Sequence, residues 1–143
     1  MGVEADFIAA REDQFDAILE SEYALDEFGG VYAKGADPLS IVDLYSAITG
    51  TDFPCENRYG DVFEVLRIED DGQRLLLRVP ENVRAALATI NFTNIDEIYG
   101  KWIETEGFQV TAWDERIARE FLEEIGKYTR HNLDKPLLMW IVV

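Results

Sequence analysis

Apolar side chains recur at helical spacing in the last third of the chain. Between residues 111 and 131 they form one stripe, at Trp113, Ile117, Phe121, Leu122, Ile125 and Tyr128. This spacing predicts a long amphipathic helix. Thr111 is its expected N-cap, with Asp114 three residues on to complete the cap, and Asn132 is its expected left-handed C-cap.

An unbroken apolar run follows this helix. Pro136 ends the turn, and residues 137–143, Leu-Leu-Met-Trp-Ile-Val-Val, hold no polar side chain. A strand that is apolar on both faces is expected to be covered on both faces. The pattern therefore predicts a central strand, and the run is far too short to span a bilayer as a helix.

Shorter patterns predict the remaining elements. Val3, Ala5, Phe7 and Ala9 alternate with acidic residues and indicate a half-buried first strand. Helical spacing or helix-start signals favour helices over residues 11–21, 37–50, 80–90 and 95–106. The segment from Glu22 to Ala36 is rich in glycine, which favours a flexible loop between short helical pieces.

Residues 62–79 carry the pattern of a β-hairpin. Two apolar runs flank Asp71-Gly72, the dipeptide favoured by a type I′ turn. The opposite-charge pair and the two apolar pairs that this turn creates agree with its register. The expected pairs are Glu69 with Arg74, Ile68 with Leu75, and Leu66 with Leu77.

Together these patterns predict a single α+β domain over residues 1–143. It has about four strands, including the 62–79 β-hairpin and the apolar central C-terminal strand, with four to five helices packed against them. A chain of 143 residues suits one domain, and a hydrophobic fraction of 48% is that of a globular protein.

The chain is strongly acidic, with a net charge of −16. This charge argues against binding to nucleic acid or to an anionic membrane surface, and it suits a basic protein partner. It is also uneven, because residues 1–72 contain 18 Asp or Glu and four Lys or Arg, whereas residues 73–143 contain 11 and nine. Nearly all of the imbalance therefore lies in the first half.

Much of this acidity falls on the expected helix over residues 11–21. Three carboxylates are spaced four residues apart on its outer face, where like charges repel, and Arg11 is the one basic residue nearby. Such a face suits recognition of a basic partner, and a merely solvated face is the alternative interpretation. The expected partner-binding residues are Glu12, Asp13, Asp16, Glu20, Asp26 and Glu27.

Several segments resemble the YfbM-like family of small bacterial proteins. They are the opening Met1-Gly2 strand with Phe7, the Ile18-Leu19-Glu20-Ser21 helix, Thr49-Gly50-Thr51 after a second helix, and the late helix that leads into the apolar C-terminal strand. The resemblance implies a soluble bacterial α+β domain of unknown activity. It supplies no catalytic residue.

The sequence contains no motif for a cofactor, a metal ion or a catalytic site. His131, the one histidine, stands at a helix end beside Arg130, where it complements the helix dipole. Cys55, the one cysteine, has the acidic neighbours Asp52 and Glu56, which disfavour a reactive thiolate. We therefore expect no catalytic residue, metal or cofactor.

Two functional hypotheses follow, and a third stays open. The first is a non-enzymatic interaction protein of the bacterial cytoplasm that binds a basic protein, as an immunity protein or antitoxin does. The alternative is a small enzyme or ligand-binding domain with clustered carboxylates in a pocket between the sheet and the Glu22–Ala36 segment. The third is a domain whose main role is to oligomerise.

Two observations distinguish these hypotheses. A deep pocket with two close carboxylates favours the ligand-binding domain, and a flat acidic surface favours the interaction protein.

A cytoplasmic location is expected because the sequence shows neither a signal peptide nor a transmembrane segment.

Overall fold

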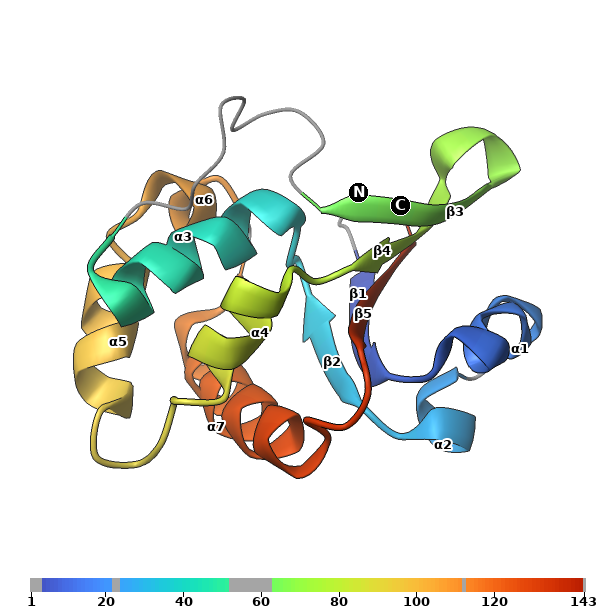
Figure 1. The fold of residues 1–143 in the computed structure, drawn as a ribbon. Coiled ribbons are helices and arrows are strands. Elements are labelled where there is room, and N and C mark those ends of the chain that lie inside the picture. The colour runs from blue at the N-terminus through green and yellow to red at the C-terminus, as the bar shows by residue number, and fades with distance from the viewer. Residues whose placement is uncertain (1–3, 22–23, 52–62, 112, 143) are drawn as a thin grey trace.

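Five strands form one antiparallel sheet in the computed structural model, which describes residues 4–21, 24–51, 63–111 and 113–142. The strand order is β2-β1-β5-β4-β3, so the apolar C-terminal strand β5 is central, as the sequence predicted (Figure 1). The strands are β1 (Glu4–Ala9), β2 (Val31–Lys34), β3 (Glu64–Glu69), β4 (Arg74–Arg78) and β5 (Leu137–Val142).

Strand β2 was not among the four strands that the sequence predicted. It lies in the segment expected to be an irregular loop, and that expectation is wrong for residues 31–34. Val31 and Ala33 are buried and alternate with exposed Tyr32 and Lys34, so a strand pattern is present but only four residues long. Gly30 and Gly35, which flank these four residues, gave a stronger signal for a loop.

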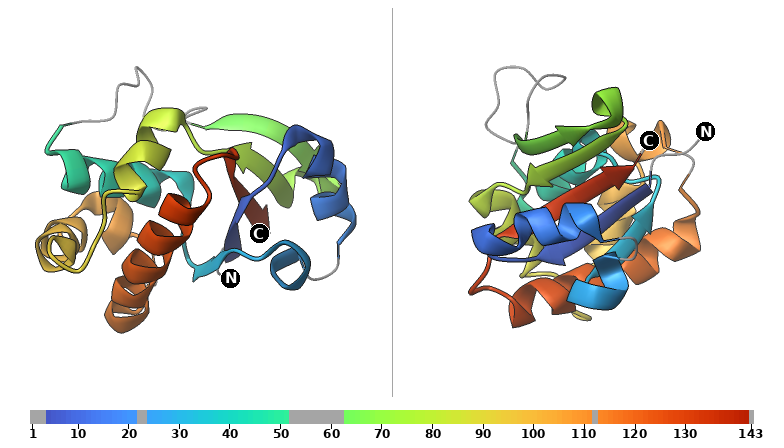
Figure 2. Two further views of the ribbon diagram at one scale, coloured as in Figure 1. Left: turned by 60° about the horizontal axis from the view of Figure 1, so that its bottom comes forward. Right: turned by 90° about the vertical axis from the view of Figure 1, so that its right-hand side faces the viewer.

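Each strand of the sheet presents alternate residues to two faces. Face A is apolar and carries Ala5, Phe7, Val31, Ala33, Leu77, Leu137, Met139 and Ile141. Face B is mixed and carries Glu4, Asp6, Ile8, Tyr32, Arg74, Leu76, Leu138, Trp140 and Val142. The two faces are covered by different helices (Figures 1 and 2).

Face A is covered by the larger group of helices. These are α3 (Pro38–Thr49), α4 (Glu81–Leu87), α5 (Ile95–Trp102), α6 (Glu106–Gln109) and α7 (Glu115–His131). Trp102, Phe108, Trp113 and Phe121 form an aromatic cluster against the sheet, with the Trp102 and Trp113 ring centroids 5.0 Å apart. The Trp102 indole N–H donates to the carbonyl oxygen of Ser40 at 2.9 Å, so its polar atom is satisfied inside the core.

Face B is covered only in part. Its cover consists of a 3-10 turn, η1 (Glu12–Gln14), and two short helices, α1 (Phe15–Glu20) and α2 (Ala24–Phe28). A small second core forms there from Ile8, Phe15, Ile18, Leu76, Leu138 and Trp140. The helix expected over residues 11–21 is therefore shorter, because its first turn is a 3-10 turn.

The described residues contain seven α-helices, more than the four or five expected. One reason is that the helix expected over 95–106 ends at Trp102. Thr105 then caps the separate helix α6, its side chain accepting a hydrogen bond from the Phe108 N–H.

The ends of α7 also differ from the expectation. Its N-cap is Asp114, whose carboxylate accepts from Arg116 N and Ile117 N, whereas the Thr111 hydroxyl donates to the Phe108 carbonyl oxygen. Ile117 is 47% exposed, so it does not belong to the buried stripe. Asn132 has φ −130°, so it is not a left-handed cap.

The hairpin of β3 and β4 forms as expected, with one shift in register. Glu69 pairs with Arg74 and Ile68 with Leu75, but Leu77 pairs with Val65 because a bulge follows Val65. The bulge turns Leu66 onto the small core of face B. Asp71 and Gly72 have positive φ, as a type I′ turn requires, and so does Asp70, so the turn (η2, Asp70–Gly72) is longer than two residues.

Candidate functional site

Strand alternation places two carboxylates on the uncovered part of face B. Glu4, Asp6 and Ile8 project from β1 toward this face, and the two acidic residues lie beyond the small apolar core. The antiparallel register sets Asp6 between Tyr32 of β2 and Trp140 of β5. Three strands that are distant in sequence therefore contribute to one row of side chains.

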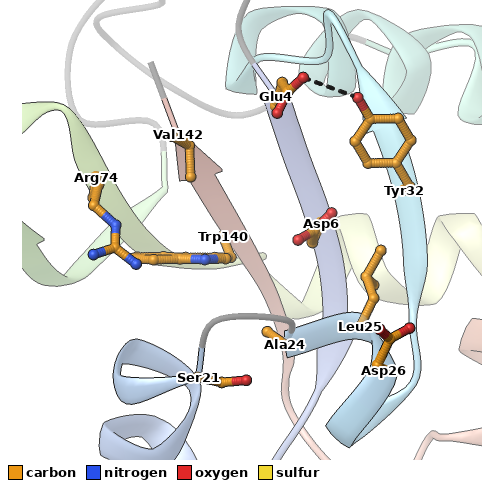
Figure 3. A pocket seen from close by; sticks show the side chains of 10 residues that line it. All are labelled: Glu4, Asp6, Ser21, Ala24, Leu25, Asp26, Tyr32, Arg74, Trp140 and Val142. Atoms are coloured by element: carbon orange, nitrogen blue, oxygen red, sulfur yellow. Dashed lines mark hydrogen bonds between the residues drawn. The ribbon is translucent and has the colours of Figure 1, made fainter.

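These residues border a pocket of about 370 Å³ (Figure 3). Its floor is the sheet, and one wall is formed by the start of α2. This volume falls in the lower part of the range of about 300–1,000 Å³ typical of small-molecule sites. The lining residues are Glu4, Asp6, Ser21, Ala24, Leu25, Asp26, Tyr32, Arg74, Trp140 and Val142.

Asp6 is a carboxylate whose charge no described residue compensates. In the part of the chain that the structure describes, no hydrogen-bond donor or basic side chain reaches its oxygens. Burial raises the Asp6 pKa from 3.8 to about 6, and the negative charge of Glu4 adds to the rise. At neutral pH the pocket therefore holds a half-buried negative charge that has no partner among the described residues.

Glu4 is held at the rim of the pocket by Tyr32. The Tyr32 hydroxyl donates to Glu4 Oε1 at 3.2 Å, across the β1–β2 pair. Partial burial and the nearby Glu4 carboxylate raise the pKa of Tyr32, so its hydroxyl stays protonated and acts as the donor. Glu4 and Asp6 form a pair of carboxylates, and in the described ranges Glu4 has a hydrogen-bond donor whereas Asp6 has none.

Arg74 adds a positive group to the same pocket. Its guanidinium carbon lies 4.9 Å from the centroid of the Trp140 ring, a cation–π contact with an indole that is only 4% exposed. Arg74 Nη1 is also 3.6 Å from Glu69 and 3.9 Å from Asp70, both longer than a hydrogen bond.

The six acidic residues expected to bind a partner are all exposed, and one of them belongs to the pocket. Asp26 of α2 lines it, whereas the other five lie outside its lining. Asp13 is 3.3 Å from Arg11, and Asp16 is 3.5 Å from Arg67 of β3, a neighbour that the sequence did not suggest. The structure does not test whether the exposed residues, Glu12, Asp13, Asp16, Glu20, Asp26 and Glu27, bind a partner.

Sequence reasoning did not single out the pocket residues Glu4, Asp6, Arg74 and Trp140. Each was assigned to a strand, the acids as solvent-facing and Trp140 as core. Their proximity depends on the pairing of β1 and β4 with β5, which no local pattern encodes. The one signal in the sequence was the pair of acidic residues in β1. The apolar strand β5 was expected to be central, so β1 was a candidate for the strand beside it.

The other residues considered for chemistry give no comparable arrangement. His131 is exposed and lines a second hollow of about 340 Å³ with Gly30, Val31, Glu124, Lys127 and Tyr128. Cys55 lies outside the described residues. Within the described ranges, no group of three His, Cys, Asp or Glu side chains has the arrangement of a metal site.

Comparison with known proteins adds one match. No protein-family model and no curated protein matches the chain. A solved structure, described as a protein of unknown function, YfbM from Escherichia coli, is 17% identical, covers 100% of both chains and has a TM-score of 0.42. The chain thus has a weak resemblance to YfbM, which carries no information on function. In the described ranges, none of the helices has the length and hydrophobicity that a membrane span requires.

Proposed function

We propose that this protein is a binding domain whose face B pocket takes a small organic cation, such as an amine or a guanidine. The observation that carries the proposal is Asp6, a half-buried carboxylate that no donor in the described part of the chain reaches, next to a second carboxylate. Burying an unpaired charge destabilises a protein, and a cationic ligand supplies both the opposite charge and the missing donor. This is the ligand-binding hypothesis raised by the sequence, with its pocket beside the Glu22–Ala36 segment.

The shape of the pocket supports a ligand of this size. Leu25 and Val142 give it apolar surface for a short hydrocarbon chain, while Asp6, Glu4 and Asp26 provide the polar contacts. Small-molecule sites commonly combine an apolar lining with a few converging polar groups. Binding weakens below pH 6, because Asp6 becomes protonated near its pKa of about 6 and no longer attracts a cation.

The test is a titration of the 15N-labelled protein with three small probes, followed by NMR. Butylammonium and guanidinium are expected to shift the amides of β1, β2 and β5 around the pocket, whereas butyrate is not. Asp6→Asn weakens cation binding roughly tenfold or more, since a hydrogen bond to a charged group contributes about 1.5–3 kcal/mol.

A matched control is available on another surface. Asp134→Asn removes one exposed carboxylate that lies outside the pocket and leaves cation binding unchanged. Equal binding by the Asp6→Asn variant and the wild type, or no response of the pocket amides to either cation, contradicts the proposal.

A second candidate is the interaction protein with a basic partner in the bacterial cytoplasm, of the immunity-protein or antitoxin kind. The observation in its favour is that all six of its expected binding residues are exposed on the α1 and α2 side. Charge complementarity of this kind accelerates encounter and is sensitive to salt.

This candidate is tested by affinity capture from the native host at low and moderate salt. The triple variant Glu12→Gln, Asp16→Asn and Glu20→Gln is expected to lose a basic protein that the wild type retains. The control triple, Glu104→Gln, Glu124→Gln and Asp134→Asn, removes the same charge from other exposed positions and retains it. Equal retention by the two triples excludes this surface.

A further inference from the structure

The pocket has a positive side as well as a negative one. Trp140 of β5 pairs with Asp6 of β1 on one side and with Leu76 of β4 on the other. Arg74, also from β4, reaches over the Trp140 ring, so the indole lies between the unpaired carboxylate and the guanidinium (Figure 3). A ligand on this floor meets opposite charges within the span of three strands.

The guanidinium of Arg74 has hydrogen-bond capacity to spare. Its contacts with Glu69 and Asp70, at 3.6 and 3.9 Å, both involve Nη1, and no hydrogen bond of its side chain occurs among the described residues. Arg84 shows the contrast, because its guanidinium donates to Glu81, to the Leu133 carbonyl and to the Lys135 carbonyl at 2.7–3.0 Å. Arg74 is therefore positioned by Trp140 and by its ion pairs with Glu69 and Asp70 through Nη1, while its other N–H groups remain available.

A ligand with a single charge suits only part of this pocket. A simple anion is repelled by Glu4, Asp6 and Asp26, and a simple cation gains nothing from Arg74. A carboxylate that accepts two parallel hydrogen bonds from a guanidinium forms one of the strongest polar contacts in proteins. The complementary ligand carries a cationic and an anionic group a short chain apart.

We infer that the ligand of this pocket is a small amino-acid-like zwitterion, with its ammonium group on Asp6 and its carboxylate on Arg74. The inference rests on the proposed function, since it names the ligand class for the same pocket. Adjacent strands lie about 4.8 Å apart, so β1 and β4 are separated by roughly 10 Å of backbone. Arg74 lies opposite Val142 and Glu4, two residues along from the row of Asp6, and its side chain reaches back over Trp140. The separation suits an ω-amino acid of a few methylene groups.

Three probes of equal chain length distinguish the contributions of the two ligand charges to binding. They are 5-aminopentanoate, pentylamine, which lacks the carboxylate, and pentanoate, which lacks the ammonium group. Calorimetric or NMR titration of the wild type is expected to show 5-aminopentanoate binding roughly tenfold tighter than pentylamine, and pentanoate weakest, because one bidentate charged contact is added.

Variants at Arg74 then assign the carboxylate contact. Arg74→Gln is expected to reduce the ratio of the two affinities to near one, and Arg74→Lys, which keeps the charge but not the fork of donors, gives an intermediate ratio. Arg116→Gln, at a side chain that is 87% exposed and outside the pocket, keeps the wild-type ratio. Urea unfolding of each variant confirms that the fold is retained.

The outcomes separate the inference from the proposed function. If pentylamine binds as tightly as 5-aminopentanoate, the zwitterion inference is overturned and the cation pocket stands. A zwitterion preference that persists in Arg74→Gln also overturns it, since the carboxylate then binds elsewhere. If neither amine binds, the proposed function and the inference fail together.

Discussion

The two faces of the sheet are formed by the same strands but differ in burial and in charge. On β1, Phe7 points to face A and is fully buried, while its neighbour Asp6 points to face B and is half-buried. On β5, Met139 and Ile141 join the apolar core of face A, while Trp140, on face B, supports Arg74. One face is closed by five helices, and the other is left partly open by α1 and α2.

This difference separates stability from recognition within one sheet. Buried apolar area and aromatic contacts on face A provide most of the free energy of folding. Because face B contributes less, it tolerates charged residues such as Glu4, Asp6 and Arg74 that are not fully paired. A pocket with unsatisfied charges beside a well-packed core is the arrangement expected of a binding site on a rigid support.

The largest expected effect comes from shortening a face A side chain of β1, the strand that has buried Phe7 on one face and half-buried Asp6 on the other. Phe7→Ala removes a ring whose centroid lies 5.4 Å from that of Phe121 and leaves a cavity in the core. It is expected to lower the free energy of unfolding by about 3–5 kcal/mol, measured by urea denaturation. Asp6→Ala, one residue away on the other face, is the control and causes no such loss. A small cost for Phe7→Ala contradicts the assignment of stability to face A.

Two helical glycines, one tightly packed and one in open space, allow the effect of packing on stability to be compared directly. A methyl group at Gly126 of α7 lies 2.6 Å from the Ile90 carbonyl oxygen, so Gly126→Ala forces α7 away from that backbone. The expected loss is about 1–3 kcal/mol. Gly100→Ala on α5 meets no described atom within 4 Å and is expected to stabilise the helix by up to about 1 kcal/mol. Thermal unfolding of both variants measures the difference, and a shift of the same sign in both contradicts tight packing at Gly126.

The next effect concerns the charge of Asp6 on face B. The folded protein holds the Asp6 proton more tightly than the unfolded chain, with a pKa of about 6 against 3.8. Asp6 therefore contributes stability below pH 3.8 and loses it as the pH rises through about 6, where its carboxylate becomes charged.

Asp6→Asn removes this dependence on pH. Allowing for partial solvent screening, the variant is expected to be more stable than the wild type by about 1–2 kcal/mol at neutral pH, with a smaller gain near pH 4. Urea denaturation of both proteins across this range measures the difference. A gain that does not vary with pH shows that the charge of Asp6 is not its cause.

The sequence predicted face A better than face B for a physical reason. Helix α7 and strand β5 are long and strongly patterned, so their existence and the central place of β5 followed from local periodicity. Strand β2 was missed because four alternating residues are a weak signal between glycines. Capping by Asp114 instead of Thr111 depends on backbone geometry, which the sequence does not reveal when two polar candidates lie three residues apart.

The alternative hypothesis drawn from the sequence located this pocket but did not identify the residues that supply its charges. The Glu22–Ala36 segment does border it, through Ala24, Leu25, Asp26 and Tyr32. Its other charges, Glu4, Asp6 and Arg74, come from β1 and β4, whose proximity depends on pairing with β5 across more than half of the chain. Such register is a tertiary property, so acidity along the sequence drew attention to α1 and not to Asp6.

The smallest expected effect tests whether exposed acids differ from Asp6. Asp16 lies 3.5 Å from Arg67, but its side chain is 79% exposed, so the pair is screened by water. Asp16→Asn is expected to change the free energy of unfolding by no more than about 0.5 kcal/mol, with little dependence on pH, as is usual for exposed pairs. Urea denaturation beside Asp6→Asn under the same conditions makes the comparison direct. If the two substitutions give equal shifts, Asp6 is an ordinary surface carboxylate, and the argument for a charged pocket on face B loses its main support.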